Sequence, residues 1–144
     1  MKASILLADH DPELAEATMR RLLARGYDVQ IATDAIQCHS LLRSFFPEVL
    51  VLDLAILWGG GDGVLEWLIE EEAVTSPAVA VIANRWWNRI PERLKSRVDV
   101  QIQRPESMSD LVPFVSQLES LAYWSQSSVR VARPVRPQSG LQKL

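Results

Sequence analysis

Two aspartates and one arginine follow segments that have the character of strands. Asp9 and Asp53 each end an apolar run, and Arg104 comes just after a more polar strand candidate at 98–103. In an open parallel sheet, ligands bind beyond the carboxyl ends of the strands. A buried carboxylate is costly unless a cation or a metal ion pairs with it. If the runs that end at Asp9 and Asp53 form neighbouring strands, the two acids therefore require Mg²⁺ or a guanidinium partner.

The elements that would position these residues alternate along the chain. Strands are expected at 4–8, 27–32, 49–53, 78–83 and 98–103, and helices at 13–25, 35–46, 63–73, 91–97 and 107–124. The central runs are apolar at every position, which is typical of strands covered on both faces. Asp11, Pro12 and Gly26 supply start and stop signals for the first helix. The pattern predicts an α/β fold with a parallel sheet between two helical layers.

The composition is that of an ordinary globular domain. The chain has 144 residues, of which 48% are hydrophobic and 23% charged, and its net charge of −3 gives no support to a nucleic-acid partner. Cys38 is the one cysteine, so an intramolecular disulfide is excluded and a reducing compartment is favoured. No apolar stretch is long enough to span a bilayer. We expect a cytoplasmic protein. Residues 125–144 carry four basic residues and no acid, and we expect them to form a flexible tail.

The order of these segments resembles a response-regulator receiver domain, the phosphoacceptor module of bacterial two-component signalling. The matching pieces are ILLADHDP, RGYDVQIATD, FFPEVLVLDL, DGVLEWL, PAVAVIA and QRP. The resemblance assigns residues 1–124 to a receiver-like domain, a signalling module rather than an enzyme. It implies a doubly wound, flavodoxin-like sheet with strand order 2-1-3-4-5.

The resemblance also implies roles for individual residues. Asp53 falls at the phosphoacceptor position, and Asp9 and Asp53 fall at Mg²⁺-ligand positions. The backbone carbonyl of Ala55 is the expected third ligand, and Asp11 is a further candidate. Arg104 falls at the position of the basic partner, followed by a proline whose peptide bond is expected to be cis.

Three positions depart from the family pattern. His10 replaces the second residue of the acidic pair, Ile82 replaces the hydroxyl residue, and Gln101 replaces the switch aromatic. Imidazole is a poor ligand for Mg²⁺, and isoleucine has no hydrogen-bond donor. We therefore expect weak Mg²⁺ binding and weak or absent phosphorylation of Asp53, in an atypical module that acts through protein–protein interaction.

Aromatic residues mark an expected interaction surface. The residues are Trp86, Trp87, Tyr123 and Trp124, and exposed aromatics are frequent interface anchors. The expected partners are a histidine kinase, another signalling protein or a second copy of the chain.

Two alternative functions stay open. One is a conventional Mg²⁺-dependent phosphoacceptor, and the other is a haloacid-dehalogenase-like phosphatase that uses Asp9 and Asp11.

Overall fold

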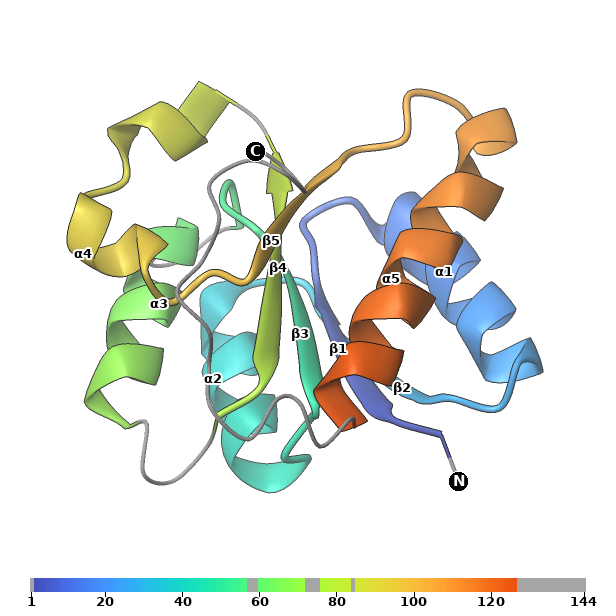
Figure 1. Cartoon of the computed structure of the whole chain (residues 1–144), viewed down its shortest axis with the longest axis horizontal. Helices are drawn as coiled ribbons and strands as arrows, with labels where there is room; N and C mark the ends of the chain where they lie inside the picture. Colours follow the sequence, from blue (N-terminus) through green and yellow to red (C-terminus); the bar gives the residue numbers. More distant parts are fainter. Residues whose placement is uncertain (1, 57–59, 72–75, 84, 127–144) are drawn as a thin grey trace.

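The computed structural model describes residues 2–56, 60–71, 76–83 and 85–126, and these contain one parallel sheet. Its strand order is β2-β1-β3-β4-β5 (Figure 1). The strands are β1 (Ser4–Ala8), β2 (Asp28–Ala32), β3 (Val49–Asp53), β4 (Ala78–Ala83) and β5 (Val100–Gln103). The predicted doubly wound, flavodoxin-like fold and its strand order are confirmed.

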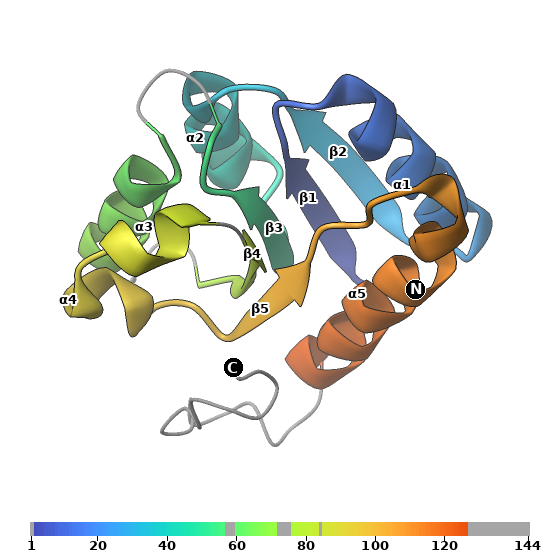
Figure 2. The same ribbon diagram turned by 90° about the horizontal axis from the view of Figure 1, so that it is seen from above.

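Helices cover both faces of this sheet, as Figure 2 shows. They are α1 (Pro12–Ala24), α2 (Ala35–Ser44), α3 (Gly60–Glu70), α4 (Glu92–Lys95) and α5 (Leu111–Gln126). One apolar cluster, which we name the α1/α5 core, includes Leu14, Leu22, Phe114 and Leu118. The other, the α2/α3 core, includes Cys38, Leu42, Leu65 and Leu68. The sheet therefore buries both faces, which explains the apolar runs of its central strands β1, β3 and β4.

Local signals set the ends of α1. The Asp11 carboxylate accepts hydrogen bonds from the backbone N–H groups of Glu13 and Leu14, and Pro12 opens the helix. Beyond its end, Gly26 has a φ of +98°, a conformation that favours glycine. Both predicted signals are thus used as expected.

Other elements differ from the sequence-based expectation. Helix α3 begins at Gly60, three residues before the predicted start, and a 3-10 turn over Arg85–Arg89 precedes α4. A second 3-10 turn, Met108–Asp110, forms the start of the predicted last helix. Helix α5 extends to Gln126, and the rest of the predicted tail, 127–144, lies outside the described residues.

Two further observations concern the described part of the chain. It contains no cis peptide bond, so Arg104–Pro105 is trans and the expected cis bond is wrong. The trans form is the one that an X–Pro bond ordinarily favours, by about 0.5–1 kcal/mol. None of its helices combines the length and the apolar character needed to cross a membrane.

Candidate functional site

The alternation of side chains along the strands brings the two acids to one place. Leu7 and Val51 lie side by side in β1 and β3, and both belong to the α1/α5 core. Two residues further along are Asp9, directly after β1, and Asp53, the last residue of β3. Because side chains alternate between the faces of a sheet, both carboxyl groups emerge on the α1/α5 side at the carboxyl edge.

Arg104, which follows β5, joins these two carboxylates. Its Nη2 atom donates to Oδ1 and Oδ2 of Asp9, at 3.2 and 3.1 Å, and to Oδ2 of Asp53, at 3.1 Å. Its Nη1 atom lies 4.0 Å from Oδ2 of Asp11. The structure thus brings together the two acids and the cation that the sequence placed at strand ends, and a guanidinium group bridges the acids.

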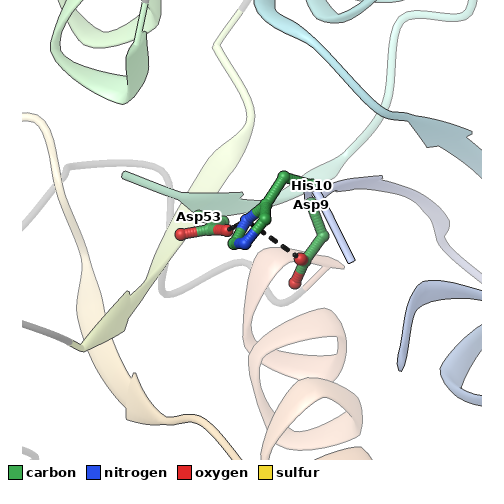
Figure 3. Close-up of side chains that lie close together, drawn as sticks. All are labelled: Asp9, His10 and Asp53. Atoms are coloured by element: carbon green, nitrogen blue, oxygen red, sulfur yellow. Dashed lines mark hydrogen bonds and ion pairs between the residues drawn. The ribbon is translucent and has the colours of Figure 1, made fainter. Parts of the chain in front are cut away.

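His10 is a second partner of Asp53. Its Nδ1 atom is hydrogen-bonded to Oδ2 of Asp53 and lies 3.8 Å from Oδ1 of Asp9, as the dashed lines in Figure 3 show. The His10 side chain is 45% exposed, whereas the Asp53 side chain is 1% exposed. Sequence reasoning missed this contact. The available signal was the position of His10 directly after Asp9, where its side chain can reach the neighbouring strand.

Backbone donors complete the surroundings of the two acids. The N–H of Ala55 donates to Oδ1 of Asp53 at 3.0 Å, so both oxygens of Asp53 accept hydrogen bonds. The N–H of Asp11 donates to Oδ1 of Asp9 at 2.8 Å. Burial raises the pKa of the Asp9 carboxyl, and the charge of Asp53 adds to this, against the lowering effects of the Asp11 N–H and Arg104.

The donor atoms at this edge do not fit Mg²⁺. Asp9, His10 and Asp53 each offer one ligand atom, and the three atoms lie within 4.8 Å of one another. Mg²⁺ requires a near-octahedral set of oxygen ligands, whereas one of these atoms is an imidazole nitrogen. The guanidinium of Arg104 also already contacts both carboxylates. Asp11 stands outside this trio, with its carboxylate bonded to the start of α1.

The remaining substituted positions, Ile82 and Gln101, lie on opposite faces of the sheet. Ile82 pairs with Asp53 across β3 and β4, and it is 1% exposed within the α1/α5 core. The neighbouring strand therefore offers an apolar surface to the acid rather than a hydroxyl group. Gln101 pairs with Val81, a member of the α2/α3 core, so its side chain is on the opposite face of the sheet from Asp53.

The four aromatic residues have different environments. Trp87 packs against the α2/α3 core, and Nζ of Lys95 lies 5.0 Å from its ring centroid. Trp124 packs against the α1/α5 core. Tyr123 is 80% exposed, and the side chain of Trp86 lies outside the described part. Two of the four thus contribute to core packing, and Tyr123 is the one seen to be largely exposed.

Comparison with solved structures defines the class of this fold. A response-regulator signal receiver domain from Bermanella marisrubri matches with a TM-score of 0.66 and 22% identity, over 82% of this chain and 98% of that one. The Mn²⁺-bound form of response regulator Rcp1 matches with a TM-score of 0.69 and 18% identity, over 87% and 96%. These likenesses establish the CheY-like receiver fold.

Sequence comparison agrees with this class. The chain is 29% identical over 112 residues to the DNA-binding response regulator MtrA of Mycolicibacterium smegmatis, covering 78% of this chain and 48% of that protein. It is 27% identical over 108 residues to the transcriptional regulatory protein TrcR of Mycobacterium tuberculosis, covering 75% and 42%. No protein-family model matches, and the chain spans about half the length of these relatives or less. The chain is thus similar in sequence, as well as in fold, to the receiver domains of two-component response regulators.

Proposed function

We propose that this chain is an atypical receiver module that signals by protein–protein interaction, with weak or absent phosphorylation at the acceptor position, Asp53. In this proposal residues 1–124 form the signalling unit and residues 125–144 form a separate basic tail. The module has no catalytic turnover of its own. Its partners are a histidine kinase, another signalling protein or a second copy of the chain.

One observation carries the proposal. Oδ2 of Asp53 is bonded by both His10 and Arg104, while Oδ1 accepts the N–H of Ala55. Phosphoryl transfer depends on positioning and on charge neutralisation around the transferred group. Here the neutralising groups of the chain are already engaged with the nucleophile itself. A phosphodonor would have to displace a hydrogen bond from a carboxylate that is 1% exposed.

The neighbouring positions favour the same function. The buried side chain of Ile82 cannot donate to a phosphoryl oxygen, and a hydrogen bond to a charged group is worth about 1.5–3 kcal/mol. Gln101 has no ring to move between exposed and buried positions. The usual acceptor chemistry and the usual readout would both be weakened.

Beryllofluoride with Mg²⁺, a mimic of the phosphoryl group, tests the proposal through backbone amide chemical shifts. We expect the natural chain to show no saturable change, and the double variant His10→Asp, Ile82→Thr, which restores the family residues, to respond at Asp53. Shifts in the natural chain that spread from Asp53 to β5 and α5 would contradict the proposal and support a conventional phosphoacceptor.

A further inference from the structure

The exposed side of the His10 ring is the part of the site that the proposed function leaves unused. We propose that His10 Nε2 is a phosphoacceptor, which takes a phosphoryl group from an acyl phosphate or a phosphohistidine donor. The inference rests on the proposed function, in which Asp53 is not itself modified. Asp53 and Arg104 then act as positioning residues for the imidazole and the incoming phosphoryl group.

Access distinguishes the two nucleophiles. The Asp53 side chain is 1% exposed and both of its oxygens are engaged, whereas the His10 side chain is 45% exposed. The ring contacts Asp53 through Nδ1 (Figure 3). Among the residues that the structure describes, no hydrogen bond to Nε2 is formed. A donor that approaches this carboxylate therefore meets the imidazole first.

The contact with Asp53 also prepares the ring for attack. A neutral imidazole carries one proton, and a carboxylate at Nδ1 holds that proton there. The lone pair is then on Nε2. A carboxylate bonded to one ring nitrogen orients the imidazole and leaves the other nitrogen free to attack, which is the arrangement of an activated nucleophile. The same carboxylate would stabilise the positive charge that the ring gains on phosphorylation.

Arg104 supplies the charge that the transferred group needs. Its Nη2 atom bonds Asp9 and Asp53, while its Nη1 atom lies 4.0 Å from the Asp11 carboxylate. The Arg104 side chain is 29% exposed. N–H groups of a partly exposed guanidinium beside the acceptor can bond phosphoryl oxygens, for which the planar arginine fork is suited.

The step balances without a redox change. The Nε2 lone pair attacks phosphorus and forms an N–P bond. The P–O bond of the acyl phosphate breaks, and its electron pair leaves with the carboxylate product. The Nδ1 proton remains in the hydrogen bond to Asp53. With a phosphohistidine donor, the P–N bond breaks instead and the donor imidazole leaves.

His39 provides a matched control, because the chain has two histidines. Its Nε2 atom is buried without a hydrogen-bond partner among the described residues, and its ring stacks on Trp67 with centroids 5.4 Å apart. It lies in α2, and no carboxylate contacts it in the described part. The two histidines thus differ in access and in activation, and only His10 should react.

The test is incubation of the full chain with acetyl phosphate and, separately, with phosphoramidate, followed by intact mass and peptide mapping. Phosphohistidine survives alkali and is cleaved by acid, whereas an aspartyl phosphate is cleaved by alkali and hydroxylamine. We expect an alkali-stable phosphoryl group on His10 that falls to background in His10→Gln and persists in His39→Gln. Asp53→Asn should slow labelling about 10-fold to 100-fold, the range for loss of an orienting partner of a histidine.

Each other outcome overturns the inference. An alkali-labile group on Asp53 would contradict both this inference and the proposed function. No label from either donor would contradict the inference and leave the proposed function standing. Equal labelling of His10 and His39 would indicate unselective chemistry. Far-UV circular dichroism of each variant establishes that the change in labelling does not arise from unfolding.

Discussion

Charge balance at the carboxyl edge of the sheet depends on a few individual side chains. Asp9 and Asp53 are both buried, and Arg104 bonds both of them. Burying a charge costs several kcal/mol, by order of magnitude, unless a partner compensates it. With His10 as a further partner, the chain supplies from its own side chains the neutralisation that a metal ion would otherwise provide.

Replacing Asp9 by Asn should show that this compensation is incomplete. Because burial raises the pKa of Asp9, its ionised form is disfavoured in the folded state. Stability from this group is then complete below its unfolded-state pKa and is lost as pH rises through the folded-state pKa. Asn resembles the protonated acid. The difference in unfolding free energy, Asp9→Asn minus natural chain, should increase in urea titrations as the pH rises above the unfolded-state pKa of the Asp9 carboxyl.

Asp53→Asn serves as the comparison, since it changes the neighbouring carboxylate in the same cluster. A difference for Asp9→Asn that is constant or that decreases with pH would contradict this account of Asp9.

The convergence of Asp9, Asp53 and Arg104 could be predicted from the sequence, because each residue comes at the end of a predicted strand and parallel strands end at one edge. The contact between His10 and Asp53 could not. It depends on the direction of a side chain just outside β1, which the strand period does not determine. Sequence reasoning therefore predicted the charges at the site, and the structure adds which atoms pair.

The start of α3 lies within a run of glycines, so its position is difficult to predict from the sequence. Residues before 63 had the composition of a loop, yet the helix begins at Gly60. A Cβ built on Gly61 would lie 2.6 Å from Cα of Leu54, so this helix packs against backbone at a distance that only glycine allows. Close approach of this kind depends on tertiary structure, and local sequence signals do not reveal it.

Gly61→Ala should destabilise the domain, and Gly63→Ala should not. The first change forces a methyl group against the Leu54 backbone, and overpacking of this kind costs about 1–3 kcal/mol. A Cβ at Gly63 meets nothing within 4 Å, so alanine there should stabilise the helix by about 0.5–1 kcal/mol. Thermal and urea unfolding measure both changes. Equal effects of the two variants would contradict the packing of α3 described above.

Across the whole molecule, the layers of the fold were predictable because the central strands are apolar at every position, and the strand order followed from the resemblance to receiver domains. The function of the surface was less predictable, since an aromatic residue can serve packing or recognition. Trp87 and Trp124 pack against the cores, whereas Tyr123 is 80% exposed on α5. Exposure therefore makes Tyr123 the most direct probe of the expected aromatic interaction surface.

Tyr123→Ala should weaken association with a second copy or with a histidine kinase by about tenfold, while leaving stability unchanged. Sedimentation equilibrium measures the first interaction, and a binding titration with a kinase measures the second. Met108→Ala is the control, because Met108 is 59% exposed and lies at the other end of the same helical segment. Association that is unaffected by Tyr123→Ala in both assays would contradict the proposed surface.

The central claim is that His10 and Arg104 occupy the place of a metal ion at Asp9 and Asp53. A Mg²⁺ titration followed by the backbone amide shifts of Asp9, Asp53 and Ala55 tests it most directly, with His10→Asp as the matched variant. We expect saturable shifts in His10→Asp, which regains an oxygen ligand, and none in the natural chain at the same Mg²⁺ concentrations. Saturable shifts of equal affinity in both chains would contradict the claim.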